Sequence, residues 1–183
     1  MLNYGSLLRV FSLAAVLISS LGIINTAQAD YDTGFAVNYV HGEGDLDGVK
    51  LAYQVNLDSL HSISKDLDLT LETSVNFWQY DGHNDTDVLV AASPILRYPL
   101  FYTHLADVYL EGGIGVSFMK DTVFAGKDVG IHFQFEDRLG FAFKFGESRK
   151  NVISLTYLHY SNAGLSDHNP GIDLLNVGYS YRF

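Results

Sequence analysis

The sequence has no cysteine, only three prolines, and fewer basic than acidic residues. Its 183 residues include 11 Lys and Arg against 21 Asp and Glu, a formal net charge of −10 at pH 7. Without cysteine the chain cannot form disulfide bonds or the thiolate ligands of a structural zinc site, and its seven histidines show no metal-ligand spacing. The acidic excess argues against a nucleic-acid partner. We therefore expect no metal ion and no nucleic acid.

The longest apolar run lies near the beginning of the chain. Arg9 is the only charged residue among the first 29, and the run from Val10 to Ile24 leads to Ala27-Gln28-Ala29. This pattern predicts a signal peptide, residues 1–29, with cleavage after Ala29. A retained membrane helix is the alternative, but the run is shorter than the ~20 residues that a helix needs to cross a bilayer. Residues 30–183 are expected to form one domain.

Beyond the apolar run, no segment of helical period is long enough to matter, and apolar residues instead alternate with polar ones. Eight segments have about the ten residues that a tilted membrane strand needs. They lie at about 33–41, 48–57, 66–79, 87–97, 107–118, 129–145, 153–161 and 173–183. Two segments depart from the pattern. Pro94 predicts a bulge or a strand end, and Asp137 falls among apolar positions, which we interpret as a bulge or a local pairing partner.

The composition and the last residues favour a membrane barrel. Tyr and Phe account for 12 residues each, glycine for 17, as expected for aromatic girdles and glycine-relieved strands. The segment Tyr179–Phe183 alternates aromatic residues and is similar to the C-terminal sorting signal of outer-membrane barrel proteins. We therefore predict an all-β fold, an eight-stranded antiparallel transmembrane β-barrel in the outer membrane. A soluble β-sandwich is the alternative.

Strand count and side-chain phase predict how such a barrel is oriented. An even number of strands places both ends of the barrel domain on the periplasmic side, so the connection at 162–172 is external. In the last two segments the odd-numbered positions are apolar and are expected to face lipid. Charges of both signs are predicted to face inward and to form a paired polar core rather than a pore. They are Lys50, Asp68, Glu72, Arg97, Glu111, Glu136, Arg138, Lys144 and Arg182.

Polar residues that can act together lie at the end of the seventh segment. His159 and Ser161 are two residues apart, and in a strand such positions project from the same face. A histidine beside a serine hydroxyl is the beginning of a nucleophile–base pair. Asp173 begins the next segment in the same phase, and cross-strand neighbours lie roughly 5 Å apart. These three side chains predict a Ser-His-acid triad on the lipid-facing rim. The alternative is a set of ordinary polar residues at a strand end.

The stretch from His159 to Leu165, followed by Asn169-Pro170-Gly171, resembles the signature of the lipid A 3-O-deacylases of the PagL type. These are outer-membrane esterases with an eight-stranded barrel. The resemblance implies that Asn162 and the backbone N–H near Gly164 stabilise the oxyanion, with Asn169 supporting the acid. The family usually has Glu as the third member of its triad, whereas this chain has Asp173.

The resemblance implies a serine esterase that needs no cofactor. Its substrate would be lipid A or lipopolysaccharide in the outer leaflet, and the bond hydrolysed would link an acyl chain at the 3-O position. One alternative is a non-catalytic barrel that binds lipopolysaccharide or a host surface through its external loops. A phospholipase is a further alternative.

Overall fold

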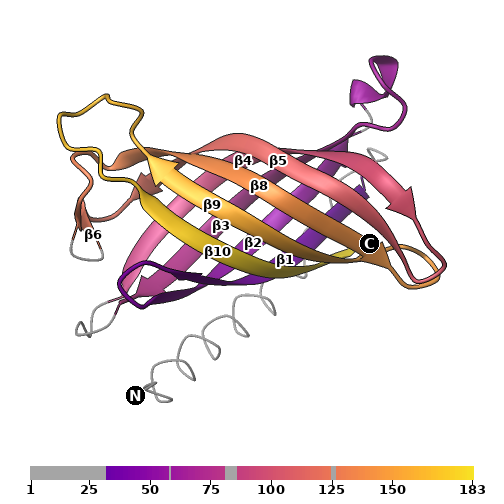
Figure 1. Ribbon diagram of the computed structural model, residues 1–183, viewed down its shortest axis with the longest axis horizontal. Coiled ribbons are helices and arrows are strands. Elements are labelled where there is room, and N and C mark those ends of the chain that lie inside the picture. The colour runs from indigo at the N-terminus through magenta and orange to yellow at the C-terminus, as the bar shows by residue number, and fades with distance from the viewer. Residues whose placement is uncertain (1–31, 58, 81–85, 125–126) are drawn as a thin grey trace, which may run out of the picture. The chain divides into compact units, whose positions relative to one another are not determined.

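The strands of the chain close into a single antiparallel barrel (Figure 1). The computed structural model describes residues 32–57, 59–80, 86–124 and 127–183, so the predicted signal peptide lies outside the described residues. The barrel strands follow one another in the order β1-β10-β9-β8-β5-β4-β3-β2. Their bounds are β1 Asp32–Gly42, β2 Leu46–Leu57, β3 Asp68–Gln79, β4 Asp87–Tyr102, β5 Ala106–Met119, β8 Phe133–Phe145, β9 Asn151–Ser161 and β10 Ile172–Arg182. The predicted eight-stranded antiparallel barrel is confirmed.

Within the described residues, three short elements accompany the barrel strands. A 3-10 helix, η1 Ser59–Ser62, lies between β2 and β3. The strands β6 Val123–Phe124 and β7 Lys127–Asp128 form a small hairpin between β5 and β8. The sixth predicted segment therefore begins too early at residue 129, because the barrel strand starts at Phe133. Within the described parts of the chain, no helix is long and apolar enough to span a membrane.

Proline does not end the fourth strand, which continues to Tyr102. The pairing of β4 with β3 is uninterrupted at Leu71–Pro94, whereas its pairing with β5 stops at Ala92–Val116 and resumes in the same register at Leu96–Gly112. Because proline has no N–H to donate, one ladder is interrupted while the other holds the strand in place. The register shift lies further on, between Pro99 and Phe101. The strand end predicted near residue 97 is therefore wrong.

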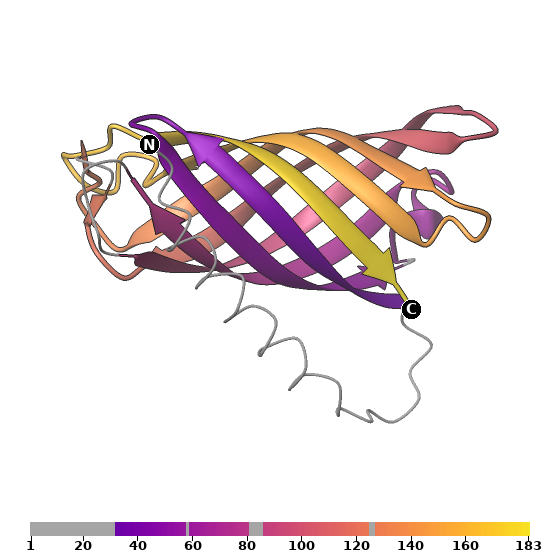
Figure 2. The same cartoon turned by 90° about the horizontal axis from the view of Figure 1, so that it is seen from below.

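The first and last strands of the barrel pair with each other and close it. The register joins Gly34 to Arg182, and the N–H of Phe183 donates to the carbonyl of Thr33 at 2.9 Å. Figure 2 shows the C-terminus at the end of β10, beside the indigo strand β1. The two ends of the described barrel therefore lie at the same end, as predicted from the even number of strands.

The middle of the barrel interior holds three basic side chains and three carboxylates, all buried. The six are Lys50, Arg97, Arg138, Glu72, Glu111 and Glu136. The Arg138 guanidinium lies 2.7 Å from Glu72 and 3.0 Å from Glu136. Its other nitrogen lies 3.4 Å from Glu111. Since an unpaired buried charge would be costly, this mutual pairing is what allows charged residues to fill the interior. The predicted paired polar core is confirmed.

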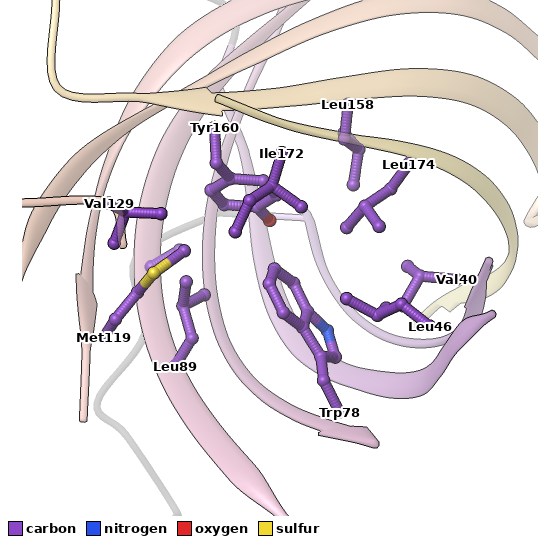
Figure 3. Close-up of a cluster of buried hydrophobic side chains, with 11 residues drawn as sticks. Val40, Leu46, Trp78, Leu89, Met119, Val129, Leu158, Tyr160, Ile172 and Leu174 are labelled. Atoms are coloured by element: carbon purple, nitrogen blue, oxygen red, sulfur yellow. The ribbon is translucent and has the colours of Figure 1, made fainter. Parts of the chain in front are cut away.

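One end of the barrel interior is apolar instead of polar (Figure 3). We call this cluster the apolar plug; its members are Val40, Leu46, Trp78, Leu89, Ala91, Met119, Val129, Leu158, Tyr160, Ile172 and Leu174. Tyr160 joins the plug to the charged core, because its ring packs edge-on against Trp78 at 5.1 Å and its hydroxyl donates to Glu136 at 2.5 Å. The plug fills the end of the barrel at which β9 finishes and β10 begins.

Candidate active site

The register between β9 and β10 brings His159 and Asp173 together. The two residues are direct Cα partners, and Nδ1 of the imidazole lies 2.6 Å from Oδ1 of the carboxylate. Since a carboxylate can only accept, Nδ1–H is the donor, and Nε2 is left as the basic nitrogen. The two side chains are 35% and 39% exposed, so the pair is accessible from outside the barrel. The side chain of Asp173, one methylene shorter than that of Glu, is therefore long enough to hydrogen-bond the imidazole.

Ser161 is the last residue of β9 and shares the outward face of His159. Its direct partner on the other side is Phe135 of β8. Among the residues that the structure describes, its hydroxyl makes no hydrogen bond. The histidine and the acid are thus already paired, while the serine lies on the same face without a hydrogen bond to the histidine. Nucleophile–base contacts are often long before the substrate is bound.

Two further side chains contact or flank this pair. The hydroxyl of Tyr157 donates to Oδ1 of Asp173 at 2.5 Å, the same oxygen that accepts from His159. On the other side, Asp137 of β8 is the direct register partner of His159. The register of β8 is uniform through this point, so Asp137 is a pairing partner and does not mark a bulge. The sequence marked Asp137 as an acid among apolar positions. The only signal for Tyr157 was its position two residues before His159.

The connection between β9 and β10 is held by the side chain of Asn162. This side chain is fully buried, and its Nδ2 donates to the carbonyls of Val129 at 2.9 Å and His168 at 2.7 Å. Its Oδ1 accepts from the N–H of Gly164 at 3.0 Å. The donors predicted to stabilise an oxyanion are thus engaged within the loop. Asn169, predicted to support the acid, instead accepts from the backbone N–H of Asn162 at 2.9 Å.

The β6–β7 hairpin also contacts this connection, at the same end of the barrel in Figure 1. Lys127 forms an ion pair with Glu43 and donates to the carbonyl of Gly171 at 3.2 Å. Asp128 lies 3.1 Å from Nδ1 of His168. These contacts come from residues 40 and 44 positions earlier in the chain, and they anchor the segment that leads into Asp173.

Comparison with known proteins agrees with the resemblance of residues 159–171 to the PagL signature. The sequence model of the family described as "Lipid A 3-O-deacylase (PagL)" matches residues 47–182. The chain belongs to this family. The lipid A deacylase PagL of Bordetella bronchiseptica is 36% identical over 163 residues, which cover 86% of this chain and 88% of that protein. The lipid A deacylase PagL of Pseudomonas aeruginosa is 35% identical over 108 residues, covering 59% and 61%.

A solved structure supports the fold independently. The crystal structure of the outer membrane enzyme PagL superposes with a TM-score of 0.67 at 22% identity, covering 81% of this chain and 98% of that one. The transmembrane barrel predicted from the sequence is therefore shown, and the soluble sandwich is wrong. Membership of the PagL family also makes the chain an ester hydrolase, not a binding barrel without activity.

In this PagL-family chain, Gly171 makes room for the imidazole. Its φ is +69°, and a Cβ added to it would lie 2.7 Å from Cε1 and 3.4 Å from Nε2 of His159. We expect Gly171→Ala to lower the rate of deacylation more than about tenfold, because the ring must move away from its position beside Asp173. Turnover of lipid A by the purified variant measures this.

Gly146→Ala is the matched control for this substitution. Gly146 has φ +81°, at the other end of the barrel, and an added Cβ would meet only the flexible amide of Asn151 at 3.0 Å. Both variants carry the strain of a left-handed backbone, but only one crowds His159. Equal activity in the two variants would show that the position of the imidazole does not depend on Gly171.

Proposed function

We propose that this chain is a serine esterase that hydrolyses an ester-linked acyl chain of lipid A at the 3-O position. The observation that carries the proposal is the 2.6 Å contact between His159 and Asp173, with Ser161 two residues along the same outward face. Family membership supports the substrate class, because the relatives at 36% and 35% identity are both named lipid A deacylases.

In the proposed reaction, Oγ of Ser161 attacks the ester carbonyl while Nε2 of His159 accepts its proton. Asp173 holds the imidazole in the tautomer that leaves Nε2 free, and stabilises the imidazolium that forms. Collapse of the tetrahedral intermediate breaks the bond to the sugar oxygen, which takes the proton from His159. A water molecule, deprotonated by the same nitrogen, then hydrolyses the acyl-serine and releases the fatty acid. No cofactor is needed for these steps.

The oxyanion of the intermediate requires hydrogen-bond donors. Asn162 and the N–H of Gly164 are the proposed donors, following the family signature. In the substrate-free loop the amide of Asn162 binds two carbonyls, and the Gly164 N–H binds Asn162 itself. Both donors would therefore have to exchange a present partner for the oxyanion when substrate binds.

The proposed site lies on the lipid-facing rim of the barrel in the outer membrane, after removal of residues 1–29 as a signal peptide. Asp173 lies ten residues before Phe183, which for a strand tilted by ~40° corresponds to roughly 25 Å of height. This height corresponds to the boundary between acyl chains and sugar headgroups. A site that faces outward there suits a substrate that cannot leave the membrane.

Mass spectrometry of lipid A tests the proposal. Cells that produce the protein are expected to contain lipid A lighter by one 3-O-linked acyl chain than cells that carry the Ser161→Ala variant. Unchanged lipid A together with newly formed lysophospholipid would replace the proposal with a phospholipase. Unchanged lipid A and phospholipid in both strains would contradict an esterase of either kind.

A further inference from the structure

The hydroxyl of Tyr157 occupies a position that the proposed triad does not account for. Tyr157 lies on β9 on the outward face of the barrel, and its ring is 46% exposed. Its register partners are Leu139 on β8 and Leu175 on β10, so both of its cross-strand neighbours are apolar. The polar contact that the structure gives this hydroxyl is the 2.5 Å hydrogen bond to Oδ1 of Asp173.

We propose that Tyr157 is a positioning residue for the acid of the triad. Two donors converge on one carboxylate oxygen, Nδ1–H of His159 at 2.6 Å and the hydroxyl of Tyr157 at 2.5 Å. The two donors approach from adjacent outward positions of the same strand. Together these two hydrogen bonds fix the rotation of the Asp173 side chain, so that Oδ1 points at the imidazole. This inference rests on the proposed function of the triad.

The contact also offsets the cost of a charge at the lipid boundary. Asp173 belongs to the outward face of β10, whose other members are mostly apolar side chains. A carboxylate in such a place is unfavourable unless hydrogen bonds replace the water that it loses. Tyr157 supplies one of these bonds throughout the catalytic cycle, whereas the charge on His159 changes. The phenol thus keeps the acid ionised and oriented while the imidazole gains and loses a proton.

The barrel contains the same arrangement a second time, without a serine. Tyr39 and His41 lie two residues apart on β1, and His41 is the register partner of Asp47 on β2. The hydroxyl of Tyr39 donates to Oδ1 of Asp47, and Nδ1 of His41 lies 2.9 Å from the same oxygen. The position two residues after His41 is Glu43, so this set has no serine where Ser161 stands in the other. Its tyrosine is also 46% exposed. Tyr39 therefore provides an internal control for Tyr157.

The test compares Tyr157→Phe with Tyr39→Phe, using purified full-length barrel and lipid A in detergent micelles. Each change removes one hydroxyl from an equally exposed ring and breaks one bond to an aspartate. We expect Tyr157→Phe to lower kcat about tenfold with KM changed by less than about twofold, as loss of a hydrogen bond to a charged group predicts. Tyr39→Phe is expected to leave both constants unchanged. Heat-modifiable gel mobility reports the folding of each variant.

A double-mutant cycle with Asp173→Asn distinguishes positioning from other roles. If Tyr157 acts through the acid, Tyr157→Phe should cause less than about a twofold further loss when Asp173 is already Asn. A further tenfold loss in that background would overturn the proposal, as would a rise in KM alone or equal losses in Tyr157→Phe and Tyr39→Phe. Ser161→Ala, measured in parallel, distinguishes failure of the triad from failure of the positioning role. An active Ser161→Ala protein contradicts the triad. An inactive Ser161→Ala protein together with a fully active Tyr157→Phe protein contradicts only the positioning role.

Discussion

Replacing Ser161 with Ala is expected to abolish lipid A deacylation while the barrel still folds. The side chain is the proposed nucleophile, and its hydroxyl makes no hydrogen bond among the described residues, so removal of one oxygen disturbs no structural contact. We expect the rate to fall by at least about a thousandfold, as is usual when a triad nucleophile is lost. Release of fatty acid from lipid A by the purified variant measures the effect.

His159→Ala is expected to produce a loss of similar size, because serine and histidine act as a unit and their effects do not add. The double variant should therefore be no less active than either single one. Unchanged heat-modifiable mobility on gels is the control for folding. Turnover near that of the parent in either variant would show that the catalytic groups lie elsewhere.

Asp173→Asn is expected to lower the rate more than about tenfold. An amide can present its NH2 group to Nδ1, which favours the tautomer in which Nε2 carries the proton and cannot serve as the base. The loss should be smaller than for Ser161→Ala, because replacing an orienting acid leaves some catalysis. Steady-state deacylation by the folded variant measures the change.

Asp173→Glu provides the matched comparison. It keeps the charge but adds a methylene to a side chain that already lies 2.6 Å from the imidazole. We expect it to retain much more activity than Asp173→Asn, since the carboxylate can fold back to meet His159. An Asp173→Asn protein as active as the parent would mean that the acid lies elsewhere. Asp167 in the connecting loop would then be the next residue to replace.

Much of the fold could be predicted because a strand that faces lipid on one side and a filled interior on the other must alternate. Alternation alone located all eight barrel strands and assigned buried charges such as Lys50 and Glu136 to the interior. Strand ends were predicted less well. Pro94 interrupts one ladder, but the other still holds β4, so a local rule about proline could not foresee a strand that reaches Tyr102.

The interior at the site end was predicted less well for a similar reason. The inward-facing charges predicted a paired polar core and gave no sign of an apolar end. Leu158, Tyr160, Ile172 and Leu174 nevertheless face inward as part of the apolar plug. The residues they pack against come from other strands, and such long-range contacts cannot be predicted from the alternation within one segment.

Within the site, spacing and phase were enough to pair His159 with Asp173, because register partners must be neighbours. The roles of the loop residues could not be read in this way. Asn162 binds the carbonyl of Val129, which is 33 residues away, and only the folded loop reveals that its amide is engaged. Tyr157 was missed because a tyrosine on a lipid-facing strand is common in such barrels, and its hydrogen bond depends on one side-chain rotation.

Because β1 pairs with β10, the order of the strands along the chain could be changed without changing which strands are neighbours in the barrel. Phe183 and Thr33 are already joined by a hydrogen bond, so a short linker could connect the two ends of the barrel. New ends opened between Thr103 and Leu105, in the tight turn at the same end, would give a circular permutant that begins with β5. The β9–β10 hairpin would then lie in the middle of the polypeptide, with every strand neighbour retained. In such a chain the C-terminal strand is β4, so assembly can be studied with a last strand that carries none of the proposed catalytic residues.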